Sequence, residues 1–96
     1  MKNIVWFCIL SMLKKDSEMY GYEIAVILKD KIDIKRVNVY SNLRKMEDSG
    51  LVVKQSVLAD NGHLRVYYAI TKSGKILHQE LLNTWEKQKN FLESIL

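Results

Sequence analysis

The sequence predicts a single domain of the mainly α (α+β) class, in which three helices are followed by a two-stranded β-hairpin and a long C-terminal helix. Three observations lead to this prediction. A chain of 96 residues with 48% hydrophobic and 27% charged residues can bury one core and no more. Apolar residues recur at helical spacing in the first half of the chain and again at its end. Between these regions, two segments rich in β-branched and aromatic residues flank an Asn-Gly pair.

The first helix is expected near residues 3–14 and the second over about three turns that end near Lys31. The run from Ile4 to Leu13 is apolar around almost the whole helix circumference, as in a helix that neighbours cover on several sides. Polar residues interrupt the pattern from Lys14 to Glu18, and after Gly21 the helical spacing returns. Ile32 to Ile34 is too short for more than a turn or a very short strand.

The third helix is expected from about Arg36 to Ser49. Val39, Leu43 and Met46 stand at i, i+4 and i+7 and therefore form one apolar stripe. Gly50 follows the pattern directly, where glycine adopts the positive φ of a helix C-cap without steric cost.

The hairpin is expected from residues 51–58 and 64–70, joined at a tip over residues 59–63 that contains Asn61 and Gly62. Thr71 can cap the last helix. Residues 76–96 contain neither glycine nor proline, so this helix can continue to the chain end. Three short helices followed by a hairpin form the winged helix-turn-helix arrangement. We expect residues 1–71 to form its core and residues 72–96 a dimerisation helix.

The net charge indicates the kind of partner, and the cysteine content indicates the cellular compartment. A formal net charge of +4 mildly favours an anionic partner. The single cysteine, Cys8, excludes an intrachain disulfide, fits a reducing compartment and is expected to be a buried, inert thiol. The first 15 residues are shorter than the about 20 needed to cross a bilayer and lack a signal-peptide cleavage pattern. We expect a cytoplasmic protein with no membrane contact.

Three segments resemble the PadR-like transcriptional regulators in the correct order, over roughly residues 5–85. Residues 19–24, Met-Tyr-Gly-Tyr-Glu-Ile, resemble the His-Gly-Tyr-Glu-Ile element that opens the family's second helix. Residues 39–52 are similar to its Leu-Tyr-Pro-x-Leu-x-x-Leu-Glu-x-x-Gly-Leu-Val recognition helix, and residues 66–74 to its Tyr-Tyr-x-Leu-Thr-x-x-Gly strand and cap. The chain departs from the family at Ser41, where proline is usual, at Asn38, where threonine or serine is common, and at Arg65, which stands alone in place of an arginine cluster.

The third helix and the hairpin tip carry the residues expected to contact double-stranded DNA. Arginine and lysine suit guanine or phosphate, asparagine suits adenine, and serine suits phosphate. The other interpretation is an ordinary solvated helix face, which more often mixes in acidic residues. By resemblance, Tyr40 packs at the helix start with its hydroxyl near a phosphate; it could equally be a partly buried aromatic residue. The candidates are Lys35, Arg36, Asn38, Tyr40, Ser41, Asn42, Arg44 and Lys45 on the helix, and Asn61, His63 and Arg65 on the hairpin.

The last helix carries an apolar seam that predicts a homodimer. Its residues follow the alternating steps of four and three that let two helices pack together. The alternative is that the helix folds back on Trp6 and the first helix. The resemblance implies that the final helix packs against the first helix of the other subunit, and that Trp85 either packs there or lines a cavity for a small aromatic effector. The interface candidates are Trp6, Leu81, Trp85, Gln88, Leu92 and Ile95.

These features favour a transcriptional repressor on a palindromic operator. The alternative is the DNA-binding component of a plasmid or phage partition or transfer complex, which would bind repeated sites. We expect no enzyme, because the sequence has no paired acid and base, no nucleophile beside a histidine and no phosphate-binding glycine loop. An interaction-only module would lack the basic face. No cofactor or metal is expected, since His63, His78 and Cys8 lie on separate elements.

Overall fold

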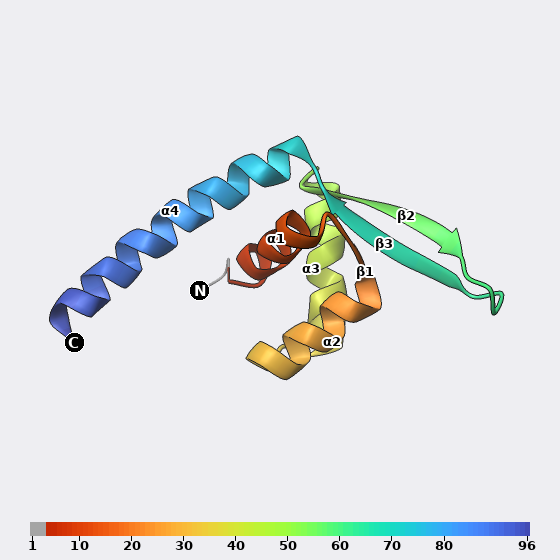
Figure 1. The fold of residues 1–96 in the computed structure, drawn as a ribbon, viewed down its shortest axis with the longest axis horizontal. Helices are drawn as coiled ribbons and strands as arrows, with labels where there is room; N and C mark the ends of the chain where they lie inside the picture. Colours follow the sequence, from red (N-terminus) through yellow and green to blue (C-terminus); the bar gives the residue numbers. More distant parts are fainter. Residues whose placement is uncertain (1–3) are drawn as a thin grey trace.

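The computed structural model describes residues 4–96 as four helices and a small antiparallel sheet (Figure 1). In chain order the elements are α1 (Ile4–Asp16), β1 (Glu18–Tyr20), α2 (Gly21–Ile32), α3 (Arg36–Asp48), β2 (Val52–Leu58), β3 (Leu64–Ile70) and α4 (Lys72–Ile95). The winged helix arrangement and the mainly α class are confirmed. Residue 3, the expected start of the first helix, lies outside the described residues.

The sheet has a third strand that the sequence analysis missed. Its strand order is β1-β3-β2, and β1 pairs with β3 through Glu18 with Ala69, Met19 with Tyr68 and Tyr20 with Tyr67. Three residues are too few to show a period of two, and Glu18 falls in the segment that we interpreted as a polar break. Strand β1 covers part of the outer edge of β3, and its buried Met19 joins the hairpin to the helical core.

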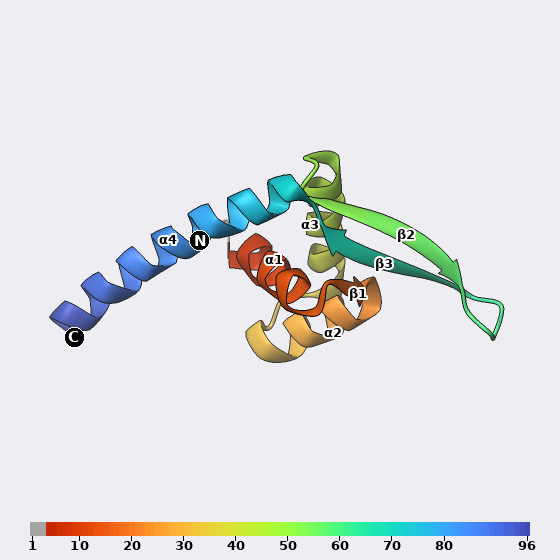
Figure 2. The ribbon, with the colours of Figure 1, turned by 45° about the horizontal axis from the view of Figure 1, so that its top comes forward.

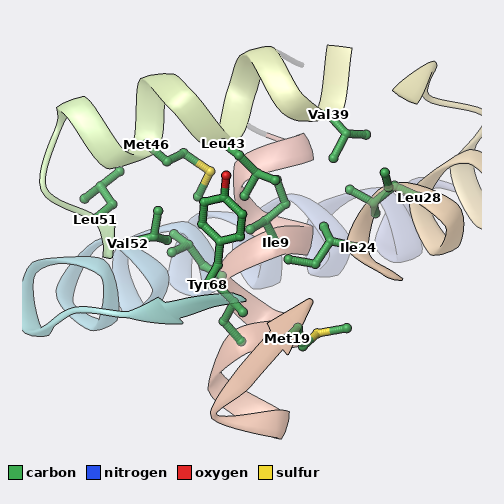
Figure 3. Packing of buried hydrophobic residues seen from close by; sticks show 13 residues of the cluster. Ile9, Met19, Ile24, Leu28, Val39, Leu43, Met46, Leu51, Val52 and Tyr68 are labelled. Atoms are coloured by element: carbon green, nitrogen blue, oxygen red, sulfur yellow. The ribbon is translucent and has the colours of Figure 1, made fainter. Parts of the chain in front are cut away.

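The hydrophobic core lies between the first three helices and the end of the sheet that adjoins them, at Val52 and Tyr68 (Figure 3). The expected stripe of α3 is confirmed, because Val39, Leu43 and Met46 are fully buried. Tyr68 extends from β3 toward this stripe, and burial raises the pKa of its hydroxyl, with Glu47 adding to the rise and Lys54 opposing it. Each fully buried aliphatic side chain contributes about 1.5–3 kcal/mol, so this cluster fixes how α3 sits on the body.

Two expected caps are present at the junction between α3 and α4. Gly50 has φ of 75° just after α3, and Leu51 N–H donates to the Met46 carbonyl at 2.9 Å. Thr71 Oγ1 accepts from Gly74 N at 3.0 Å and donates to the Gly50 carbonyl at 2.6 Å. The threonine therefore caps α4 and joins its start to the end of α3. The helix begins at Lys72, directly after the predicted cap, and continues to Ile95.

The first half of α4 packs on α1, and its second half extends away from the body, as both views show (Figures 1 and 2). The Ser11 hydroxyl lies 2.9 Å from His78 Nε2 and shares a hydrogen bond with it. The Phe7 ring lies 5.6 Å from the His78 ring and 6.4 Å from that of Trp85. Within the described chain, no helix is long and apolar enough to span a membrane.

The surroundings of Cys8 differ from the expected full burial. Its side chain is only partly buried, because it faces a hollow between α1, α2 and α4 that no other part of the described chain fills. Burial nevertheless raises the pKa of the thiol, which disfavours the reactive thiolate.

Candidate nucleic-acid interface

The exposed side of α3 carries positive charge from its N-cap Lys35 and Arg36 to Arg44 and Lys45. The first turn of the helix has no acidic residue and no side-chain cap, so its amide groups add to the positive charge of the side chains. The acidic residues lie at the other end of the helix, where Glu47 pairs with Lys54 at 3.4 Å. The predicted contact residues that are exposed on α3 or at its N-cap are Lys35, Arg36, Asn38, Tyr40, Ser41, Arg44 and Lys45.

Asn42 is a predicted contact on α3 whose side-chain amide is hydrogen-bonded on both of its polar atoms within the protein. Its Oδ1 accepts from Trp6 Nε1 at 2.9 Å, and its Nδ2 donates to the Asn38 carbonyl at 2.7 Å. Trp6, predicted for the dimer interface, therefore bonds to α3. The hydrogen bond between Trp6 and Asn42 joins α1 to α3 and helps to set the rotation of α3 about its axis. That rotation sets the direction of the exposed side of α3.

Two arginines, Arg36 on α3 and Arg65 on β3, each stack on a tyrosine. Arg36 Cζ lies 5.3 Å from the centroid of the Tyr22 ring, and Arg65 Cζ lies 5.5 Å from that of Tyr20. Among residues 4–96, neither guanidinium has a carboxylate within 4.0 Å. Both charges are therefore held in place while they stay free of an acidic partner.

A shallow groove of about 250 Å³ lies between the start of α2, strand β3 and Tyr40 of α3. Gly21 allows the close approach of α2 and β3 along it, because a Cβ at this position would lie 3.0 Å from Tyr68 Cε2. Tyr40, which is 42% exposed, lies at the groove with its ring accessible. The lining residues are Tyr20, Gly21, Tyr22, Tyr40, Leu64, Val66 and Tyr68.

The hairpin tip is a tight turn beyond the end of the paired strands. Asn61 Oδ1 accepts from His63 N at 3.1 Å, and Gly62 has φ of 83°. His63 is exposed. In the described part of the chain, no three His, Cys, Asp or Glu side chains are grouped to hold a metal ion. Arg65 lies on β3 opposite Val57, and its guanidinium turns back toward Tyr20.

The extended half of α4 carries an exposed apolar stripe among polar residues. Leu81 is partly buried and Trp85 is 40% exposed, whereas Leu92 is 51% and Ile95 61% exposed. Gln88 is also exposed, so the predicted seam becomes steadily more open toward the chain end. Beside it lies a hollow of about 410 Å³ with mainly apolar walls. It is lined by Ile4, Phe7, Cys8, Ser11, Met12, Ile27, Leu28, Lys31, Ile32 and Trp85.

Sequence reasoning missed four residues that lie beside the predicted basic side chains. Val37 is 68% exposed at the start of α3, off the buried stripe, where an apolar side chain suits a thymine methyl group. Tyr20 and Tyr22 stack at 6.0 Å, and Tyr67 lies 5.7 Å from Tyr20. Their aromatic character is visible in the sequence, but the cluster depends on the pairing of β1 with β3.

Comparisons with known proteins agree with this geometry. The sequence of residues 9–80 matches the model of the transcriptional regulator PadR-like family. The chain is 28% identical to smu.1704 from Streptococcus mutans UA159, with a TM-score of 0.86 over 96% of this chain and 85% of that one. It is 26% identical to a PadR family transcription regulator from Clostridium difficile R20291, with a TM-score of 0.82 over 95% and 96%. A third structure, Bacillus subtilis PadR in complex with operator DNA, is 25% identical, with a TM-score of 0.74 over 82% of this chain and 46% of that chain.

Proposed function

The chain belongs to the transcriptional regulator PadR-like family, and we propose that it binds double-stranded DNA as a homodimer, as a repressor at a roughly palindromic operator. The observation that carries this proposal is the exposed cationic side of α3, together with Arg65 on β3. Arg36 and Arg65 have no carboxylate within 4.0 Å among the described residues. The solved complex of Bacillus subtilis PadR with operator DNA supports it from a relative.

In the proposed mode of binding, α3 enters the major groove and the hairpin lies along its rim. Arg36, Asn38, Ser41 and Lys45 are exposed on α3 and are the types that contact base edges and phosphates. Asn61 and His63 at the hairpin tip would reach toward the neighbouring minor groove. Asn42 acts through its bond to Trp6, which sets the orientation of the helix.

The homodimer is proposed from the apolar side chains of α4. Phe91, Leu92 and Ile95 are each more than half exposed on a helix that leaves the body, and exposed apolar surface of this kind marks an interface. A second copy of α4, packed along the seam and against α1, would cover them and fill part of the apolar hollow. Residues 1–71 would then contact DNA and residues 72–96 would join the subunits, with two α3 helices about one DNA turn apart.

A small aromatic effector is proposed for the same hollow. Phe7 and Trp85 line it, and flat aromatic molecules stack on such rings. Titration of candidate aromatic compounds while the fluorescence of Trp85 is recorded in a Trp6→Phe background tests this; unchanged emission with every compound would contradict it.

Removal of charge from the proposed face tests the DNA-binding function. The triple variant Arg36→Ala, Lys45→Ala, Arg65→Ala should lose most of its affinity for duplex DNA from the upstream region of the chain's own gene, because phosphate contacts dominate such affinity. A control triple variant, Lys15→Ala, Lys29→Ala, Lys75→Ala, removes the same number of charges elsewhere and should bind almost as the wild type does. Equal affinities of the two variants would refute the placement of the interface. Cooperative filling of tandem repeats would instead favour a partition or transfer complex.

A further inference from the structure

Four stacked side chains form a continuous path from α3 to the hairpin. The order is Arg36 on α3, Tyr22 at the start of α2, Tyr20 at the end of β1, and Arg65 on β3; we call this set the Arg-Tyr ladder. The separations are 5.3 Å, 6.0 Å and 5.5 Å from group to group. Tyr67, 5.7 Å from Tyr20, supports the ladder from the sheet.

The ladder holds each guanidinium in a fixed direction on an exposed surface. Arginine is planar and stacks on aromatic faces while its N–H groups stay free at the edge to donate. Tyr22 is 46% exposed, so the path lies at the surface and is not part of the core. A stacked arginine loses less conformational freedom on contact with phosphate than a free one, which favours binding.

The amino terminus of α2 beneath the ladder is already capped. The Glu23 carboxylate accepts from Tyr20 N–H at 3.3 Å and so partly neutralises the helix end. The positive groups on the path are therefore the two guanidinium groups at its ends.

We propose that the Arg-Tyr ladder binds the sugar-phosphate backbone that separates the groove entered by α3 from the groove beside the hairpin, with Tyr20 as a positioning residue for Arg65. This inference rests on the proposed DNA-binding function. A surface between the recognition helix and the hairpin faces that backbone when both grooves are occupied. The direction of Arg65, away from the hairpin tip and toward Tyr20, favours phosphate over a base edge in the minor groove.

The decisive experiment is a double-mutant cycle with two DNA probes of equal length, the upstream duplex and a duplex of scrambled sequence. An exposed cation–π contact corresponds to a factor of about two to five in affinity. Tyr20→Leu should weaken binding to both duplexes by about this factor, whereas Tyr20→Phe, which keeps the ring, should not. Arg65→Ala should weaken both equally and reduce the salt slope by about one phosphate contact. In the Arg65→Ala background, Tyr20→Leu should have little further effect.

A second pair, Tyr22 and Arg36, keeps the proposal testable if the Tyr20 variants at the end of β1 fold poorly. Tyr22→Leu and Arg36→Ala should show the same non-additive loss, and all variants are compared with the wild type by thermal unfolding before binding is measured. If Tyr20→Leu and Tyr22→Leu keep wild-type affinity and salt slope, or if their effects add fully to those of the arginine variants, the ladder has no role in binding. A loss confined to the upstream duplex would mean base readout and would also overturn the proposal. A wild-type protein that binds neither duplex would overturn the proposed function itself, and the ladder with it.

Discussion

Substitution of Gly74 by alanine tests how tightly α4 is seated on the end of α3. A Cβ at this position would overlap the Leu51 carbonyl oxygen and lie 2.7 Å from Ile70 Cγ1. The carbonyl cannot easily turn aside, because it accepts from Thr71 N–H at 3.1 Å. Gly74 N–H also donates to Thr71 Oγ1, so a shift of the α4 backbone would strain the helix cap.

Two opposing effects set the expected magnitude. In an open helix, alanine is favoured over glycine by about 1 kcal/mol. Overpacking in a filled site costs about 1–3 kcal/mol, and contact with a rigid backbone belongs to the upper part of that range. We expect a net loss of roughly 1–2 kcal/mol in the free energy of unfolding, and a chain of this size loses about 4–8 °C in Tm per kcal/mol.

The assay is thermal unfolding followed by circular dichroism at one fixed protein concentration, because assembly makes Tm depend on concentration. Ser73→Ala is the matched control, since Ser73 is exposed on the same helical turn. It should change the stability by no more than about 0.5 kcal/mol. If Gly74→Ala were as stable as the wild type or more stable, the close contact between α4 and Leu51 would be wrong.

Four further predictions follow from named contacts. Thr71→Ala should lower the free energy of unfolding by about 1–2 kcal/mol in urea titrations, because it removes both the cap of α4 and the bond to Gly50, whereas Thr71→Ser should retain most of it. Burial, with Lys14 adding to it, lowers the pKa of His78 below the ordinary value of 6.5. The stability that depends on neutral His78 is therefore complete above pH 6.5, its unfolded-state pKa, and is lost as the pH falls through the lower pKa of the folded state. The urea midpoint of the wild type should fall more steeply below pH 6.5 than that of His78→Gln. Parallel curves for the two proteins would contradict this. Leu92→Glu should shift sedimentation equilibrium to the monomer, with a cost of about 2 kcal/mol or more, whereas Asn90→Glu, with the same added charge, should leave the dimer intact. Trp6→Phe should lower stability by about 1 kcal/mol and weaken DNA binding through the lost bond to Asn42; a variant that lost stability alone would show that this bond does not orient α3.

Much of the fold could be predicted because its signals are local. Val39, Leu43 and Met46 repeat at helical spacing, and Gly50 and Thr71 mark helix ends by their own chemistry, so their places followed from neighbouring residues. The strand β1 could not be found in this way. It is a strand only because Met19 pairs with Tyr68, which lies far along the chain.

The residue types of the candidate site can be read from the sequence, but their arrangement in space cannot. The exposed cations of α3 follow from its periodicity, since side chains off the buried stripe face solvent. The stacking of Arg65 on Tyr20 and the bond from Trp6 to Asn42 join residues on different elements. Such contacts depend on how the elements are packed, which spacing in one sequence does not encode.

The most direct test of the central claim is a titration of the wild-type protein with its upstream duplex and with a scrambled duplex, repeated over a range of salt concentrations. We expect tighter binding to the upstream duplex and a steep loss of affinity with salt, because binding would neutralise several phosphates. Affinity that is weak, equal for both duplexes and insensitive to salt would contradict it.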